Sequence, residues 1–409
     1  MASLEKRIIS AILNKIRAHR QAPLIQENGA HAQRPATLPP AKLREAQFSD
    51  YAAVTELKGR WGLTTDSMEN WERLWVRNPA LARLPVRRPI GWVLETDSGI
   101  VGYLGNISST YSYGDKSLNA VTSSGLAVDP AYRAVSLSLV SAFYRQEAAD
   151  LFLVTTAIPA VGRIARVFKS EPLPQADYET VLFWVLQPHP FAQAVARKLK
   201  LRPALAGPGS ILGSVSVQVD TVLRGRRPGR PKGSLAVSEI KVEQIGDDFR
   251  ALWMNKLKER PRLYADRSPC SLKWHYQIPG DTGKTTIFCC YDENELRGYA
   301  VVRNGISRMN GLDRSMVADM LVLQDDPEVT KTLLARAYDH AKKSGSHILE
   351  VLGFPKSVRE VCEKGNPYSR KYPACPFYYK AADATLHKVF SDGAAWYATP
   401  FDGDTTLMP

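Results

Sequence analysis

The sequence predicts an α/β protein built from two units, each a mixed central sheet flanked by helices. Apolar residues recur with alternating spacing in some stretches and with helical spacing in others, so strands and helices follow one another along the chain. The order strand, helices, hairpin, long strand, helix, strand, helix, strand occurs twice, which indicates an internal duplication. At roughly 150 residues per domain, the 409 residues are long enough for two cores.

The first unit starts near Leu43, and capping residues mark its elements. Ser49-Asp50 can cap a helix, Asp97-Ser98-Gly99 is a turn between two alternating apolar runs, and Asp129-Pro130 opens a further helix. The expected strands are 43–46, 91–95, 100–107, 117–128, 151–156 and 181–186, and the expected helices begin near residues 50, 67, 130 and 159.

The second unit repeats this order. Its best-marked helix spans 327–344, with acids before it, Pro327 in its first turn, lysines in its last turn and Gly345 after it. The expected strands are 238–245, 285–291, 296–303, 316–322, 347–352, 377–381 and 396–399, and the other helices are 247–257 and 355–363.

Pro/Gly-rich stretches predict four segments. Residues 1–42 are an amphipathic helix (4–17) and a Pro-rich linker, 43–200 and 238–409 are the two folded domains, and 201–237 is a basic linker. The N-terminal helix carries basic residues beside its apolar stripe, so residues 1–23 suit either a protein contact or an anionic membrane surface. We favour a protein contact, because one short helix binds a membrane weakly.

The net charge of +13 is unevenly distributed. Residues 1–23 carry +4 and residues 224–232 carry +5, so the rest of the chain carries +4. The folded parts are therefore only mildly basic and give no general case for a nucleic-acid-binding face. No apolar stretch of about 18 residues exists, so no membrane-spanning helix is expected.

The cysteines indicate a reducing compartment. Cys270, Cys289, Cys290, Cys362 and Cys375 are odd in number and form no CxxC pair, so we expect free, mostly buried thiols. The N-terminus lacks the apolar core of a secretory signal, and we expect a cytoplasmic protein. The seven histidines are scattered, so no metal site is expected.

One junction in the first unit carries a family resemblance. Residues 126–133, Leu-Ala-Val-Asp-Pro-Ala-Tyr-Arg, resemble the V-x-P-x-Y-R strand-to-helix junction of the acyl-CoA N-acyltransferase (GNAT) superfamily. In that family the following loop holds the pyrophosphate of coenzyme A with backbone N–H groups at a helix N-terminus. The resemblance assigns acyl-CoA binding to residues of this strand and loop: Leu126, Ala127, Val128, Arg133, Ala134, Val135, Ser136, Leu137 and Ser138.

The first unit departs from the family pattern at four positions. Ser136 and Ser138 replace the two loop glycines; serine still presents its N–H but is poorer where φ must be positive. The resemblance also expects an Asn and a proton-donating Tyr on the helix after the next strand. Ile158 and Ala165 stand there instead, so catalysis would need another group or positioning alone.

The second unit has a worse phosphate loop but offers a candidate base. Asp325, Asp326 and Glu328 would repel a pyrophosphate and are better explained as helix capping. Asp319 lies among apolar residues of strand 316–322 and shares a face with Val317 and Leu321. We expect a half-buried base that removes a proton from an ammonium, with a paired or solvent-facing carboxylate as the alternative.

Three further features are weaker. Tyr379 follows Tyr378 on a strand and is a candidate general acid, with routine packing as the alternative. Asp402 and Asp404 suit a metal or sugar hydroxyls, but a tight Asp-Gly turn is the preferred interpretation. Residues 226–233 resemble an AT-hook, a minor-groove DNA clip, although basic Pro-rich sequence is common in linkers and we interpret it as one.

The sequence therefore predicts an acyltransferase that moves an acyl group, by preference acetyl, from acyl-CoA to an amine on a small molecule, sugar or peptide. The amine would attack the thioester directly, with strand N–H groups polarising its carbonyl. Two alternatives stay open: a catalytically inactive tandem scaffold or binding protein, and a DNA-associated regulator that uses the basic linker.

Overall fold

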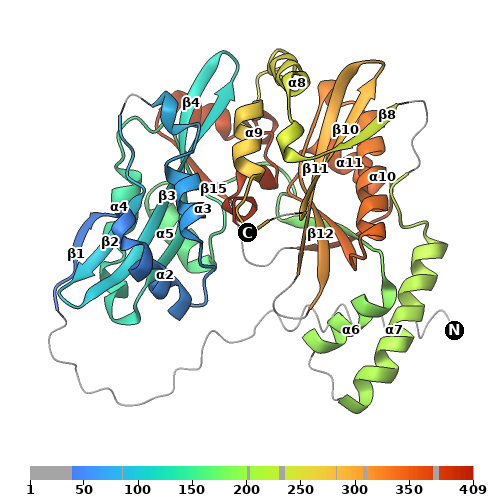
Figure 1. The fold of residues 1–409 in the computed structure, drawn as a ribbon, viewed down its shortest axis with the longest axis horizontal. Coiled ribbons are helices and arrows are strands. Elements are labelled where there is room, and N and C mark those ends of the chain that lie inside the picture. The colour runs from blue at the N-terminus through green and yellow to red at the C-terminus, as the bar shows by residue number, and fades with distance from the viewer. Residues whose placement is uncertain are drawn as a thin grey trace. The chain divides into compact units, whose positions relative to one another are not determined.

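The fold comes from a computed structural model, which describes residues 39–84, 86–199, 203–229, 235–281, 283–306, 311–371 and 377–408. The predicted helix 4–17 and Cys375 lie outside these residues. The strands form two mixed sheets, A and B, and Figure 1 shows helices packed against both. The α/β class predicted from the sequence is confirmed.

Sheet A holds most strands of the first unit and two strands from farther along the chain, β9 and β15. Its order is β1-β2-β3-β4-β5-β15-β6, and β9 pairs with β3. The strands are β1 (Lys42–Glu45), β2 (Gly91–Thr96), β3 (Gly99–Tyr113), β4 (Lys116–Val128), β5 (Leu151–Val154), β6 (Glu171–Pro172), β9 (Tyr264–Ala265) and β15 (Tyr378–Ala381).

Sheet B is the matching sheet of the second unit. Its order is β14-β7-β13-β12-β11-β10-β8. The strands are β7 (Thr180–Val185), β8 (Ala236–Ile240), β10 (Thr285–Asp292), β11 (Glu295–Ile306), β12 (Asp313–Val322), β13 (Ile348–Leu352) and β14 (Tyr368–Lys371).

The two sheets exchange strands: besides the short β9, sheet A takes up β15, and sheet B takes up β7. β15 comes from the C-terminal half but pairs antiparallel with β5 and β6, and Figure 1 shows it among the strands of sheet A. β7 comes from the N-terminal half but pairs antiparallel with β13 and β14. The strands therefore do not divide between the sheets at residue 200, and the predicted domain bounds stay a prediction.

Most helices begin where the sequence predicts because their caps are local. Asp326 accepts hydrogen bonds from the backbone N–H groups of Glu328 and Val329 at the start of α10. The helices are α2 (Tyr51–Arg60), α3 (Met68–Trp75), α4 (Leu137–Tyr144), α5 (Pro159–Val167), α6 (Pro188–Lys198), α7 (Pro203–Leu223), α8 (Asp247–Leu257), α9 (Pro269–Tyr276), α10 (Pro327–Lys343), α11 (Lys356–Glu363) and α12 (Ala384–Phe390).

Three local predictions need correction. The helix expected from residue 130 begins as a 3-10 segment, Pro130–Val135, before α4. The strand expected at 396–399 forms only one isolated bridge, Trp396 to Leu263, and is followed by the 3-10 turn η8 (Pro400–Asp402). Residues 203–223, expected to be part of a linker, form helix α7. None of the helices in the described ranges is long and apolar enough to cross a membrane.

The largest core cluster draws on both halves of the chain. It combines Tyr111 and Leu151 of sheet A with Tyr299 of sheet B and with Trp396 and Tyr397 of the C-terminal segment. Cys289 belongs to this cluster, and its neighbour Cys290 belongs to the core beneath α10, as strand alternation predicts. Cys289, Cys290 and Cys362 are buried free thiols, as expected for most of the cysteines, and Cys270 is a free thiol that is exposed.

Candidate active site

Sheet A opens between β4 and β5. The two parallel strands are paired over three residues only, ending at Thr122 and Leu153, while β4 continues to Val128. On its other edge β4 has a β-bulge, in which Gly125 and Leu126 lie opposite the single residue Leu104 of β3. Gly125 has a positive φ of +65 in this bulge. Beyond Thr122 the edge of β4 that faces β5 has no strand partner, so backbone groups of β4 lie outside the ladder at this opening.

A cavity of about 450 Å³ lies at this opening. Its walls come from the free part of β4, from α4 and α5, and from the C-terminal segment, and they are mainly apolar. The lining side chains include Leu126, Phe143, Ile164, Asp404 and Met408. Lys58 also lines it, and its ammonium pairs with Asp66 at 2.7 Å. We call this space the cleft.

The residues predicted to bind acyl-CoA lie at the cleft and directly after it. Leu126 lines the cleft, whereas Ala127 is buried in the core beneath α2 on the other face and Val128 packs with the α4 side. The loop residues Arg133, Ala134, Val135, Ser136, Leu137 and Ser138 form the 3-10 segment and the first turn of α4.

The two loop serines fit their backbone without strain. Ser136 has φ −60, and neither it nor Ser138 has a positive φ. The hydroxyl of Ser136 donates to Arg133 O and that of Ser138 to Val135 O, both at 2.7 Å. The loop therefore does not need glycine for its conformation.

The positions of the missing family residues also lie in the cleft. Ile158 and Ala165 both line it, one at the start of α5 and one two turns later. Their side chains carry no hydrogen-bonding group, so the proton donor that the resemblance expects is absent at this place.

Asp404 is a functional candidate to which the sequence analysis assigned no catalytic role. Its side chain is buried, and the carboxylate accepts hydrogen bonds from the hydroxyls of Thr155 at 3.0 Å and Thr156 at 3.3 Å, just after β5. Its own N–H donates to Thr155 Oγ1 at 3.1 Å. Burial raises the pKa of Asp404 above its ordinary value, while the hydroxyl hydrogen bonds from Thr155, Thr156 and Ser124 oppose that rise.

Asp404 differs from the other buried acids in its partners. Asp50, Asp66, Asp266, Asp281, Asp319, Glu350 and Asp402 each lie within 4 Å of an Arg or Lys nitrogen. Asp404 has no such cation among the described residues, and its partners are hydroxyls. A buried carboxylate without a cation is costly, and a cationic ligand would relieve that cost.

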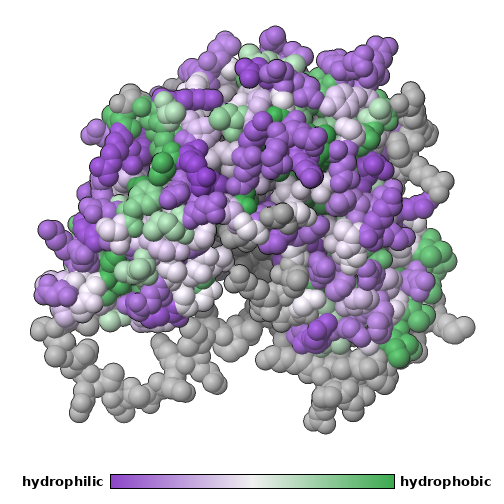
Figure 2. Space-filling view, viewed as in Figure 1, coloured by the Kyte–Doolittle hydropathy of each residue, from purple (hydrophilic) through white to green (hydrophobic). Residues whose placement is uncertain are grey.

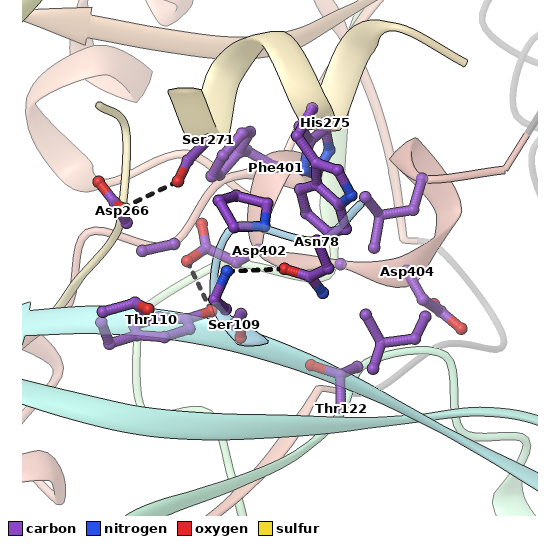
Figure 3. A pocket seen from close by; sticks show the side chains of 18 residues that line it. Asn78, Ser109, Thr110, Thr122, Asp266, Ser271, His275, Phe401, Asp402 and Asp404 are labelled. Atoms are coloured by element: carbon purple, nitrogen blue, oxygen red, sulfur yellow. Dashed lines mark hydrogen bonds between the residues drawn. The ribbon is translucent and has the colours of Figure 1, made fainter. Parts of the chain in front are cut away.

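A second, smaller cavity of about 50 Å³ lies on the other side of Asp404, which lines both spaces. Figure 3 shows side chains from β3, β4, α9 and the C-terminal segment converging on it, among them Ser109, Asp266 and Asp402. Ser271 donates to Asp266 at 2.8 Å. The hydroxyl of Ser109 is buried and has no hydrogen-bond partner among the described residues. The cavity therefore offers carboxylates and one unsatisfied hydroxyl.

Asp319 is a paired carboxylate, which is one of the alternatives given for it, and not the half-buried base that we expected. It is fully buried, as its strand face suggested, but it pairs with the equally buried Arg267, with Nε to Oδ2 at 3.0 Å. Tyr299 and Thr399 donate their hydroxyls to it, each at 2.7 Å. Arg267 also contacts Asp402 at 3.3 Å. These donors saturate Asp319, and it lines neither the cleft nor the smaller cavity, so its geometry suits support of the C-terminal segment rather than proton transfer.

Tyr379 also lies away from both cavities. It is fully buried on β15, stacks on His387 and contacts Trp396 edge-on. Its hydroxyl lies 3.5 Å from Glu171 Oε2, and burial, followed by the charge of Glu171, raises its pKa to about 12. The contacts match the packing alternative given for this residue.

The corresponding opening of sheet B is filled by the chain itself. β12 pairs with β13 as far as Val317 and then runs on to Val322. The C-terminal segment occupies this place: Tyr397 donates its hydroxyl to Met320 O at 2.8 Å, and Thr399 bonds to Asp319. The same segment then continues to Asp404 in the first unit.

The acids after β12 are used within the fold. Asp326 caps α10, as expected for this group. Asp325 instead pairs with Lys256 at 2.8 Å and Arg262 at 2.9 Å, and these contacts outweigh burial and lower its pKa to about 2.

The structure also bears on the expected absence of a metal site and on the basic stretch near residue 226. In the described parts of the chain, no three His, Cys, Asp or Glu side chains come together in a way that could hold a metal ion. Arg226 of the basic stretch lies 2.5 Å from Asp220 and stacks over Tyr368, with its Cζ 4.0 Å from the ring centre. The later residues of this stretch, 230–233, lie outside the described ranges.

Neither family models nor curated protein sequences match this chain. Solved structures do. A GCN5-related N-acetyltransferase from Anabaena variabilis is 10% identical, with 84% of this chain and 73% of that chain covered and a TM-score of 0.53. One from Kribbella flavida is 13% identical (85% and 72% covered, TM-score 0.51). The N-myristoyltransferase of Saccharomyces cerevisiae, in a structure with bound myristoyl-CoA, is 13% identical (88% and 83% covered, TM-score 0.52).

These likenesses, together with the opened sheet, identify a class: the chain has the fold of the GNAT superfamily. At these identities they establish the fold, and the chemistry must be argued from the site itself.

Proposed function

We propose that this protein is an acyltransferase that moves an acyl group, by preference acetyl, from acyl-CoA to an amine. The observation that carries the proposal is the position of Asp404. This buried carboxylate stands between a cleft at the opening of sheet A and a small cavity with further carboxylates. An acyl donor bound in the cleft and an amine bound in the small cavity would therefore meet beside Asp404.

The cleft suits the donor. Its apolar walls fit the acyl group and the pantetheine arm of coenzyme A, and the opened strand β4 supplies hydrogen-bonding backbone groups. The pyrophosphate would lie at the start of α4, where Arg133 is exposed and contacts no carboxylate in the described ranges. Dipoles and N–H groups at that helix start favour an anion.

The reaction would be a direct transfer. Asp404 takes a proton from the incoming ammonium, and the neutral amine attacks the thioester carbonyl carbon. Backbone N–H groups of β4 at the opening stabilise the developing oxyanion. The C–S bond then breaks, and the leaving thiolate takes the second proton from the attacking nitrogen, which gives an amide and the thiol of coenzyme A. Because thiols have an ordinary pKa near 8.5, this thiolate is an adequate leaving group without a tyrosine at position 165.

The acceptor class follows from charge. A cation is what the uncompensated Asp404 would recognise, which favours an ammonium over a neutral hydroxyl. Use of acyl-CoA and the buried free thiols fit a reaction in the cytoplasm.

The test is acetyl-CoA binding to the full chain by calorimetry, followed by release of free thiol with a panel of amines and alcohols. We expect saturable binding and thiol release that depends on an amine. A series of acyl-CoA donors then ranks acetyl against longer chains.

Saturable binding without release for any acceptor would favour the scaffold alternative, which the apolar residues at positions 158 and 165 also favour. Absence of binding at millimolar acetyl-CoA would contradict the proposal.

A further inference from the structure

Helix α7 has one packed face and one exposed face. With α6 it forms a helix pair outside the two sheets, and Figure 1 shows the two helices side by side. Gly213 of α7 faces Ala192 of α6 closely, and Ala192, Ala194 and Ala196 of α6 are buried. The small residues let the two helices approach, so α6 covers one side of α7 and leaves the other side open.

The open side carries an apolar stripe. Six large aliphatic side chains on this helix are between 44% and 80% exposed: Ile211, Leu212, Val215, Val219, Val222 and Leu223. At 100° per residue these positions fall within an arc of about 120° and extend over about 18 Å of helix. Figure 2 shows hydrophobic surface at the place of α7. Exposed aliphatic side chains gathered on one helix face mark a contact surface.

The sequence around the stripe is rich in Lys and Arg. Residues 188–233 contain nine Lys and Arg and a single acid, Asp220. That acid is already paired with Arg224 at 2.7 Å and Arg226 at 2.5 Å. Arg197 and Lys198 are exposed at the end of α6 that leads into α7, and Arg224 and Arg227 are exposed beyond the other end of α7. Cations therefore flank the stripe at both ends.

We propose that the α7 stripe docks on an anionic lipid surface. Aliphatic side chains in the interface and Lys or Arg near the headgroups are the two features by which amphipathic helices bind such membranes. The charges disfavour a second copy of the chain, because a contact through the stripes would bring two cationic clusters together. The chain would thus lie on a membrane through one helix face, without spanning it.

The experiment is flotation of the full chain with vesicles of phosphatidylcholine that contain 30% or no phosphatidylglycerol. We expect at least ten-fold stronger binding to the anionic vesicles, and loss of most of that binding at high salt. The test variant carries Val215→Asp and Val219→Asp and should bind at least ten-fold more weakly.

The matched control carries Ser216→Asp and Gln218→Asp. It adds the same charge to exposed positions of the same helix but keeps all six stripe residues, so it should bind much more strongly than the test variant. Circular dichroism and acetyl-CoA binding check that both variants fold.

Three outcomes would overturn the proposal. If the wild-type protein does not float with the anionic vesicles, the stripe does not dock on a lipid surface. Equal binding by test and control variants assigns any binding to another part of the chain. A dimer in sedimentation that the test variant alone dissociates makes the stripe a self-contact.

Discussion

Sheet A and sheet B open at the same place, but only one of the openings is free. Beyond Thr122 in sheet A the space is a cleft of about 450 Å³, whereas beyond Val317 in sheet B it holds the hydroxyl-bearing side chains of Tyr397 and Thr399. One C-terminal segment produces both outcomes, because residues 396–402 fill the second opening and residues 404–408 line the first. A duplicated fold has thus been divided into a half with a free cleft and a half that supports it.

This comparison predicts that substitutions in the two halves impair different properties of the protein. Around sheet B they should cost stability, and around the cleft of sheet A they should cost binding or turnover. The expected effects below run from the largest to the smallest.

Arg267→Met should lower the free energy of unfolding by about 3–5 kcal/mol. The substitution leaves Asp319 and Asp402 buried without their cation. Denaturant unfolding measures the effect, and Arg260→Met is the matched control, since that side chain is 59% exposed and should cost less than about 1 kcal/mol. A loss similar to the control would show that the buried network does not hold the second half together.

Asp404→Asn should reduce turnover on the order of 100-fold or more and leave acetyl-CoA affinity unchanged. The amide keeps the shape of the side chain but removes the base. Asp97→Asn, in an exposed turn, is the control and should turn over normally. Near-native turnover in Asp404→Asn would show that Asp404 is not the base. It would not contradict the proposal that the cleft binds the acyl donor.

The same variant should be more stable than the wild type at pH 8. Because burial raises the folded pKa of Asp404 above 3.8, its ionised form costs stability once the pH exceeds that value. The gain in Tm should therefore disappear as the pH falls to about 3.8. A Tm that is lower than wild type at pH 8 would mean that the carboxylate is structural.

Ser136→Asp should abolish the increase in Tm that acetyl-CoA produces, because a carboxylate would stand where the pyrophosphate is expected. At a concentration 100 times Kd that increase corresponds to about 2.7 kcal/mol. Gln324→Asp adds an acid at the matching junction after β12 and should keep the increase. If only the Gln324→Asp variant loses the increase in Tm, then acetyl-CoA binds to the second half and the roles of the two halves are reversed.

Asp325→Asn should lower the free energy of unfolding at pH 7 by about 1–2 kcal/mol, after allowance for solvent screening. Its pairs with Lys256 and Arg262 lower its pKa from 3.8 to about 2, so the stabilisation is present above pH 3.8. Unfolding measured across pH 2–5 should show the difference from wild type vanish toward pH 2. A constant difference would mean that the loss comes from packing and not from charge.

The local features of the fold were predictable because their causes are local. The cap at Asp326 and the alternation of Cys289 and Cys290 each depend on residues a few positions apart. Asp319 shows where such inference stops. Its strand face predicted burial correctly, but its partner Arg267 lies 52 residues away in sequence and no spacing rule links them.

By itself, then, the sequence determined the element order, its duplication and the strand-to-helix junction that resembles acyl-CoA N-acyltransferases. Only the tertiary structure decided that β7 and β15 change sheets, that one opening is filled, and that Asp404 rather than Asp319 stands at the cleft. The physical reason is that side-chain periodicity specifies which face of a strand is buried, whereas strand partners and the path of a C-terminal segment depend on contacts between residues hundreds of positions apart.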